Sequence, residues 1–147
     1  MKTLIFSFLF LFGSTLFAQE QLVGRWSGLG QDEQMKTLCE RADLSVSQEQ
    51  NVMVVHEAHF NCSGELAFDL HDLEFHIDNG LLIYKNKIVG HIHGGKAQIN
   101  LPATASGNVE VTLNRAPGSD SLLVRIVVGK ISGNIFLTRS WLFDLRQ

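Results

Sequence analysis

The stretch FHIDNGLLIYKNKIVGHIHGG, residues 75–95, places three tight turns between short apolar segments. Asn79-Gly80 is the strongest hairpin signal in the chain, because both residue types tolerate the positive φ angles of a two-residue turn. Lys85-Asn86-Lys87 and Gly94-Gly95 predict two further turns, each followed by another strand-like segment. Turns this closely spaced are typical of short antiparallel strands that follow one another in a meander.

Apolar and polar residues alternate with a period of two along most of the remaining chain, which indicates strands with one buried face. A change of parity near Asp72 predicts a bulge or a turn there. The polar segment 31–40 is the one candidate for a short helix or a long lid. The strand-like segments are 22–29, 44–47, 52–55, 66–71, 73–78, 81–84, 88–93, 97–101, 109–113, 122–128 and 135–143.

We count these segments as eight to ten short strands, which either stack as two sheets or close into a barrel, and closure removes the exposed sheet edges that favour aggregation. The sequence therefore predicts an all-β fold, an antiparallel up-and-down meander closed into a small β-barrel of about eight strands. The chain has 147 residues, enough for one domain. With 12 Lys and Arg residues against 15 Asp and Glu residues, it lacks the cationic surface that nucleic-acid binding requires.

The first 18 residues have the pattern of a secretory signal peptide. Lys2 precedes an apolar run over residues 4–12, small residues follow at 13–15, and Ala18 marks a cleavage position. The run is shorter than the ~20 apolar residues of a membrane-spanning helix, which argues against the alternative of an uncleaved anchor. We therefore predict an exported protein, periplasmic or secreted, in which residues 19–147 form a single β-barrel domain. After cleavage it has no stable membrane insertion.

Cys39 and Cys62 are the two cysteines of the chain. An even pair in an exported protein predicts a disulfide, which here closes a loop of about 24 residues and stabilises the fold by roughly 3 kcal/mol. Metal ligation by the thiolates, redox chemistry, and two buried free thiols are the alternatives.

Gly24-Arg25-Trp26 lies just behind the predicted signal peptide, in the first predicted strand. This Gly-x-Trp resembles the one at the start of calycin barrels, the superfamily of lipocalins, avidins and fatty-acid-binding proteins. Arg139, in the last predicted strand, resembles the basic residue that calycins place across that tryptophan. The resemblance implies that Gly24, Trp26 and Arg139 close one end of the barrel, with the guanidinium stacked on the indole. The chain has no room for the lipocalin C-terminal helix and too few tryptophans for an avidin pocket, so the resemblance implies the barrel and not a ligand.

The inward positions of such a barrel are mostly Leu, Ile, Val or Phe, which offer apolar surface and no evident polar anchor. We predict that they bind a small apolar or amphipathic molecule in the interior, with no cofactor and no catalysis. The alternative is a filled core in an envelope interaction or inhibitor module, whose protein partner is unknown. The predicted lining residues are Phe68, Phe75, Ile77, Ile83, Val111, Leu113, Val124 and Ile126, together with Leu66 and Leu70.

All six histidines fall between positions 56 and 93. His91 and His93 share one face of a predicted strand, at a spacing of about 7 Å that can chelate a divalent metal. His76, or His71 with Asp69, supplies a third ligand if the hairpins bring these strands into register. A metal-binding barrel is therefore a further alternative, set against a solvated outer face that carries no metal.

The sequence contains no motif that predicts an enzyme. It has no Gly-x-Ser-x-Gly, no His-Glu-x-x-His and no phosphate-binding glycine loop. The segment His56-Glu57-Ala58-His59 is one residue short of the zinc-protease motif, and the preceding residues 52–55 are predicted to be a strand rather than a helix. The prediction is accordingly a binding protein and not an enzyme.

Overall fold

The computed structural model describes residues 20–147 except 105, 106 and 133, and it shows a closed antiparallel β-barrel of ten strands. The predicted all-β meander and its closure are confirmed, with ten strands in place of about eight. The predicted signal peptide, residues 1–18, lies outside the described residues. The elements are the 3₁₀ helix η1 (Glu20–Leu22) and the strands β1 (Gly24–Asp32), β2 (Ala42–Glu49), β3 (Val52–Cys62), β4 (Leu66–Asp78), β5 (Leu81–Tyr84), β6 (Lys87–His93), β7 (Lys96–Thr104), β8 (Gly107–Arg115), β9 (Ser121–Ser132) and β10 (Ile135–Arg146).

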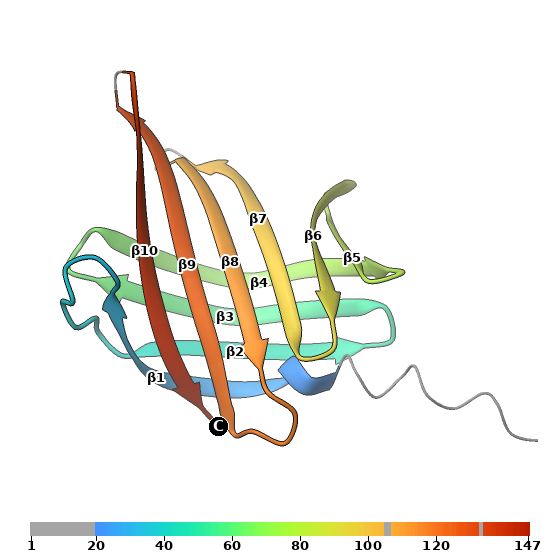
Figure 1. The fold of residues 1–147 in the computed structure, drawn as a ribbon. Helices are drawn as coiled ribbons and strands as arrows, with labels where there is room; N and C mark the ends of the chain where they lie inside the picture. Colours follow the sequence, from blue (N-terminus) through green and yellow to red (C-terminus); the bar gives the residue numbers. More distant parts are fainter. Residues whose placement is uncertain (1–19, 105–106, 133) are drawn as a thin grey trace, which may run out of the picture.

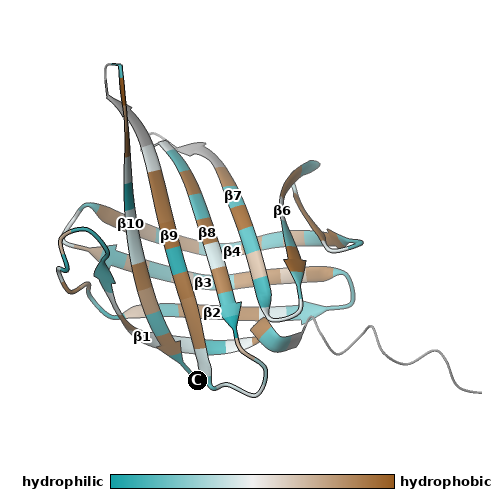
Figure 2. Cartoon of the chain, in the orientation of Figure 1, coloured by the Kyte–Doolittle hydropathy of each residue, from teal (hydrophilic) through white to brown (hydrophobic). Residues whose placement is uncertain are grey.

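The strands form two layers. Figure 1 shows β2, β3 and β4 crossing the molecule at a steep angle to β7, β8, β9 and β10, with the short β5 and β6 at one side. Hydrophobic and hydrophilic residues alternate along strands such as β8 (Figure 2), and the buried side chains of both layers meet in one core. We call the end that carries the β1–β2, β3–β4, β5–β6, β7–β8 and β9–β10 connections the upper end, and the opposite end, with η1, the lower end.

The turns within residues 75–95 have the predicted geometry. Asn79 and Gly80, with φ angles of 49° and 81°, connect β4 to β5. Lys85 and Asn86, with φ angles of 48° and 62°, connect β5 to β6. Positive φ at both central residues is the type I′ conformation, whose twist matches that of the flanking strands.

The sequence predicted two interruptions of the strand pattern, one near Asp72 and one over residues 31–40. The predicted bulge or turn near Asp72 is not found: Asp72 has a φ of 52° and no ladder partner among the described residues, but β4 continues through it and its register with β3 is the same on both sides. The segment 31–40 forms no helix: after β1 the chain runs as a loop, residues 33–41, at the upper end. Backbone hydrogen bonds hold this loop, among them one of 2.8 Å from the N–H of Cys39 to the carbonyl of Gly30.

The barrel closes along a seam between β1 and β10, with pairs from Ser27–Arg146 to Asp32–Trp141. Two glycines of β1 make this approach sterically feasible. A Cβ on Gly28 would lie 2.0 Å from the carbonyl oxygen of Asp144, and one on Gly30 would lie 2.2 Å from the ring of Phe143. A larger residue at either place would force the two strands or the Phe143 ring to shift.

The lower end is plugged by Trp26, which is 1% exposed. Its indole Nε1 donates a hydrogen bond of 3.1 Å to the carbonyl of Leu22 in η1. The guanidinium of Arg115, at the end of β8, lies 4.8 Å from the centre of the indole ring. Arg115 also donates hydrogen bonds of 2.7 Å to the carbonyls of Gln21 and Ser119. The plug therefore joins η1, β1 and the β8–β9 turn.

The prediction that Arg139 stacks on Trp26 is wrong. Because β10 runs antiparallel to β1, the residue that faces Ser27 is Arg146, and Arg139 lies beyond Asp32 at the upper end. The cation that the calycin resemblance assigned to the last strand is supplied by Arg115 of β8. Gly24 does lie at the lower end, where it begins β1 beside Gln147.

Substitution of Arg115 tests this plug. We expect Arg115→Ala to lower the free energy of unfolding by about 2 to 3 kcal/mol, because it removes the stacked cation and leaves two carbonyls without their donor. Urea denaturation followed by circular dichroism measures the change. Arg25→Ala, which removes an exposed arginine beside the plug, is the matched control and should change stability by less than about 0.5 kcal/mol. Equal losses in the two variants would contradict the assignment.

Candidate ligand-binding site

The barrel interior contains a cavity of about 40 Å³ whose lining residues are all apolar. It lies between the two layers of strands, so that residues far apart in the sequence share it. The lining residues are Leu44, Val55, Ala58, Phe60, Phe68, Leu70, Leu73, Phe75, Ile99, Leu101, Val111, Leu113 and Ile126.

The predicted lining residues divide into three groups. Most of them line the cavity, namely Phe68, Leu70, Phe75, Val111, Leu113 and Ile126. Leu66, Ile77 and Val124 are buried in the same core, away from the cavity lining. Ile83 is outside the core, and the prediction for it is wrong, because its neighbour Leu82 takes the buried position of β5.

One side of the cavity is not covered by a strand. β5 pairs with β4 only at residues 76–78, and β6 pairs with β7 only at residues 96–99. Above these pairs, in the part of the chain that the structure describes, residues 66–75 of β4 and 100–104 of β7 have no ladder partner toward each other. Phe68, Leu70 and Leu73 of β4 and Leu101 of β7 are only partly buried there, although they line the cavity. We call this opening the lateral interval.

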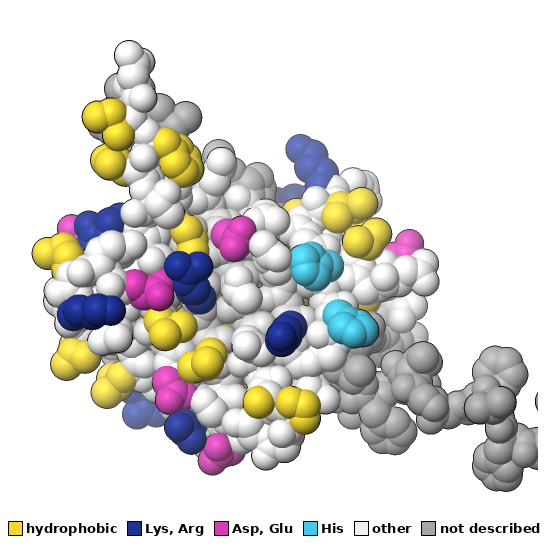
Figure 3. All heavy atoms as spheres, viewed as in Figure 1, with side chains coloured by type: hydrophobic (Ala, Val, Ile, Leu, Met, Phe, Trp, Pro, Cys, Tyr) yellow, Lys and Arg dark blue, Asp and Glu magenta, His cyan; other side chains and the backbone are white. Residues whose placement is uncertain are grey.

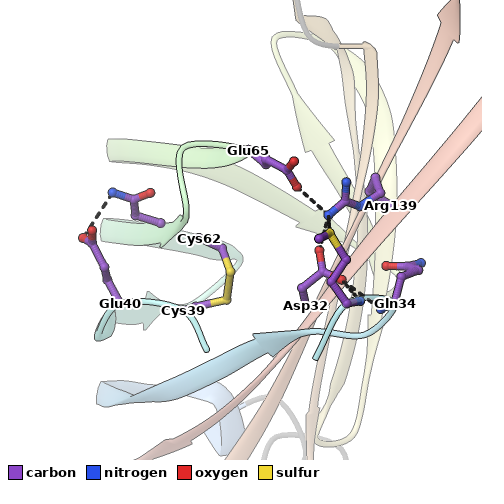
Figure 4. Close-up of a disulfide and its surroundings, with 9 residues drawn as sticks. Asp32, Gln34, Cys39, Glu40, Cys62, Glu65 and Arg139 are labelled. Atoms are coloured by element: carbon purple, nitrogen blue, oxygen red, sulfur yellow. Dashed lines mark hydrogen bonds and ion pairs between the residues drawn. A yellow bond between two sulfur atoms is a disulfide. The ribbon is translucent and has the colours of Figure 1, made fainter. Parts of the chain in front are cut away.

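Arg139 lies at the upper end, on the inward side of β10, and is held by two carboxylates. It forms ion pairs with Asp32 at the end of β1 and with Glu65 before β4. Figure 4 shows the guanidinium between these two side chains. Arg139 thus ties β10 to the β1–β2 and β3–β4 connections.

The environment of Asp32 favours its ionised form. The carboxylate accepts hydrogen bonds of 2.6 Å from the N–H of Met35 and 2.9 Å from the N–H of Gln34. The bond from Met35, followed by the one from the Arg139 guanidinium, lowers the pKa of Asp32 below its ordinary value of 3.8, against the opposing effect of burial. The same pairing raises the pKa of Arg139, so both groups are charged at neutral pH.

Two donors near this ion pair have no partner. Among the described residues, Arg139 Nε and Trp141 Nε1 are buried and make no hydrogen bond. Both side chains line a second cavity of about 270 Å³ at the upper end, together with Asp32, Glu65 and Cys62. An unpaired buried donor costs about 1 to 3 kcal/mol, so an acceptor brought to this cavity would be stabilised. The sequence analysis did not predict this cluster of Arg139, Asp32 and Glu65. The feature that could have indicated it is the position of Arg139, a charged residue on the same strand face as the apolar Trp141 and Phe143.

The disulfide is present as predicted, between Cys39 in the β1–β2 loop and Cys62 at the end of β3. It lies beside the ion pairs of Arg139 (Figure 4), and Asn61 next to it donates a hydrogen bond of 3.1 Å to Glu40. The bond therefore anchors the loop that carries Gln34 and Met35. A structural disulfide is consistent with an exported protein.

The histidines lie on the outer face. His91 and His93 are exposed on β6, and β5 separates His76 of β4 from that strand. His71 contacts Asp69 at 3.1 Å, and His59 lies 3.7 Å from the same carboxylate. No group of three or more His, Cys, Asp or Glu residues in the described part of the chain is placed to hold a metal ion. The predicted set His76, His91 and His93 is thus not brought together.

Another outer-face group resembles a catalytic triad in composition. Ser47 Oγ lies 2.7 Å from Nε2 of His56, whose Nδ1 lies 3.7 Å from Asp72. The Asp72 side chain is 82% exposed, however, and neither Ser47 nor Asp72 lines any of the cavities described above. A working triad needs a carboxylate that fixes the imidazole and donors that receive an oxyanion. The absence of catalysis stays a prediction.

No family model, curated protein or solved structure matches the chain. Among the described residues, no helix has the length and apolar character needed to cross a membrane.

The low pKa of Asp32 predicts acid sensitivity. Its ionised form contributes stability in full above the ordinary pKa of 3.8, and this contribution is lost as pH falls through the lower pKa of the folded state. Asp32→Asn should therefore be less stable than the wild type at neutral pH, and the difference should narrow below pH 3.8. Thermal unfolding at a series of pH values measures it. The exposed Asp78→Asn is the control, and a difference for Asp32→Asn that does not vary with pH would contradict this account.

The disulfide predicts a stability loss on removal. Cys39→Ala/Cys62→Ala should lower the free energy of unfolding by roughly 3 kcal/mol, because the unfolded chain regains the freedom of the closed loop. Urea denaturation with and without a thiol reductant provides the measurement. The reductant should lower the stability of the wild type by the same amount and leave the double variant unchanged. A reductant effect of equal size on both proteins would show that the loss has another source.

Proposed function

We propose that this protein is an exported, calycin-like barrel that binds a small apolar or amphipathic molecule in its interior, without catalysis. The observation that supports the proposal is the wholly apolar cavity whose partly buried residues line the lateral interval. Apolar surface removed from water there contributes about 25 cal/mol per Å² to binding. The lateral interval gives such a molecule a route to the core that breaks no backbone hydrogen bond of the ladder.

The size of the cavity limits the shape of the ligand. Its volume of about 40 Å³ is well below the roughly 150 Å³ of an engineered cavity that holds benzene. Binding therefore requires side chains to move, and Phe68, Leu70 and Leu73 are suited to it because they stand on the unpaired edge of β4. A narrow, flexible chain needs the smallest displacement, so we favour an aliphatic ligand over a rigid ring system.

The upper cavity favours a particular polar group on that ligand. Arg139 Nε and Trp141 Nε1 offer two donors, but the charge of Arg139 is already balanced by Asp32 and Glu65. A further carboxylate would be repelled by these two acids. A neutral oxygen, as in a hydroxyl, carbonyl or ester, accepts from the same donors without that cost. The proposed ligand is thus an aliphatic molecule with a neutral oxygen at one end.

The small cavity also favours a second candidate, a filled core in an envelope interaction or inhibitor module. In that case the interior binds nothing, and the loops of the upper end contact a protein. The two candidates differ in whether an apolar probe enters the barrel.

Titration with the fluorescent apolar probe N-phenyl-1-naphthylamine distinguishes them. We expect saturable binding to the wild type and at least tenfold weaker binding to Leu101→Trp, because the indole fills the lateral interval. Leu123→Trp, on the exposed face of β9, adds the same bulk outside the barrel and should bind the probe like the wild type. Long-chain alcohols should displace the probe more strongly than fatty acids of equal length.

Absence of saturable binding to the wild type would reject the ligand proposal in favour of the filled core. Equal weakening by the two tryptophan variants would place the probe elsewhere. Thermal unfolding of each variant establishes that it is folded at the temperature of the titration.

A further inference from the structure

The polar groups of the upper cavity are arranged by depth. Trp141 is 2% exposed, and its Nε1 is one of the two buried donors without a partner among the described residues. Glu65 lies at the mouth of the same cavity, with 51% of its side chain exposed. A molecule in this cavity therefore meets hydrogen-bond donors at the buried end and a carboxylate at the mouth.

The buried end of the upper cavity adjoins the apolar interior. Cys62 lines the upper cavity, and Phe60, two residues earlier on the same face of β3, lines the interior cavity. In the other layer, Trp141 of β10 pairs with Ile126 of β9, which also lines the interior cavity. Because two residues of a strand span only about 7 Å, one extended molecule can reach both cavities.

The mouth of the upper cavity favours hydroxyl groups. Glu65 binds Arg139 through Oε2, so in the part of the chain that the structure describes its Oε1 stays an acceptor without a cation. Thr37 and Ser63 line the cavity as well, and their hydroxyls can both donate and accept. An ionised carboxylate accepts only, so its partner at the mouth must be a donor such as a hydroxyl.

The charges beside the cavity disfavour an ionic ligand of either sign. Figure 3 shows basic and acidic side chains next to each other below the projecting β9–β10 hairpin. Asp32 and Glu65 flank Arg139, and Glu33 binds Arg125 at 2.8 Å. The two carboxylates repel an anion, and the guanidinium between them repels a cation. A neutral group with hydroxyls forms its hydrogen bonds without either cost.

We propose that the ligand is a fatty acyl ester of a small polyol, of which a monoacylglycerol is the simplest. This inference rests on the proposed function, because it specifies the ligand of the same barrel. The acyl chain lies in the interior cavity, the ester oxygens accept from Trp141 and Arg139, and a free hydroxyl donates to Glu65. A cavity of roughly 150 Å³ holds benzene, so the upper cavity of about 270 Å³ accommodates the ester and glyceryl groups.

The order of chemical groups along the ligand separates this class from simpler lipids. A methyl ester satisfies the buried donors but offers nothing to Glu65, and an alcohol has one polar group for two ends of the cavity. A polyol ester satisfies both ends. A hydrogen bond to a charged group contributes about tenfold to an affinity, which sets the expected advantage of the polyol ester over the methyl ester.

Displacement of N-phenyl-1-naphthylamine tests the proposal. The competitors are 1-decanoylglycerol, methyl decanoate, decanoate and decylamine, each below its critical micelle concentration. We expect 1-decanoylglycerol to displace the probe at about tenfold lower concentration than methyl decanoate, and at lower concentration than either charged compound.

Glu65→Ala should reduce the advantage of 1-decanoylglycerol over methyl decanoate to less than about twofold, because the acceptor at the mouth is lost. Glu40→Ala is the matched control. It removes another exposed carboxylate of the upper connections, one that does not line the cavity, and should keep the full advantage.

The indole N–H signals of the ¹⁵N-labelled wild type give a second measurement that needs no variant. Binding of 1-decanoylglycerol should move the Trp141 proton signal downfield, because its Nε1 gains an acceptor. Trp26 is the internal control: its Nε1 already donates to the carbonyl of Leu22 at 3.1 Å, so its signal should move much less.

Equal displacement by 1-decanoylglycerol and methyl decanoate would overturn this inference and leave the proposed ligand-binding function standing. Stronger displacement by decanoate or decylamine would overturn it as well, and so would a Trp141 signal that does not move at saturation. Absence of saturable probe binding to the wild type would instead reject the proposed function, and this inference with it.

Discussion

The close contact between β1 and β10 is the constraint on which the rest of the structure depends. Without it the ten strands would form an open sheet with two free edges, and the two layers would not enclose a core. The contact is possible because Gly28 and Gly30 have no side chain, which leaves room for the Asp144 backbone and the Phe143 ring. It also brings Asp32 within reach of Arg139, so the polar cluster at the upper end is a consequence of closure.

Much of the fold and most of the cavity lining follow from local sequence signals, whereas the polar cluster at the upper end does not. Turn residues such as Asn79-Gly80 and the alternation in β8 and β9 report on neighbours in the chain, which is why the meander was predictable. Whether the number of strands is eight or ten depends on short segments such as β5, in which Leu82 rather than Ile83 is buried. A one-residue change of register exchanges the two faces of a strand, and the sequence alone does not determine it.

The wrong prediction for Trp26 and Arg139 has a similar cause, because contacts between residues far apart in the sequence cannot be predicted from local signals. A buried indole in the first strand requires a group that covers it, and the sequence supported that much. Which cation covers it depends on how far β10 extends past β1, which only the pairing of distant strands reveals. Arg115 is the last residue of β8 and stands in no distinguishing motif, and its contact with Trp26 joins residues 89 positions apart. The two unpaired donors of Arg139 and Trp141 were equally out of reach, because they are defined by what surrounds them.

The lateral interval gives the barrel an uneven mechanical character. Around most of the circumference, widening the barrel would break ladder hydrogen bonds, whereas between β4 and β7 only side chains need to separate. Backbone groups along those two edges can bond to water already, so swelling there carries no loss of main-chain pairing. Opening the barrel therefore costs less between β4 and β7 than at any place where two strands are joined by a continuous ladder. The barrel thus keeps the hydrogen bonds of a closed sheet around most of its circumference, and on one side it can change shape through side-chain movement alone.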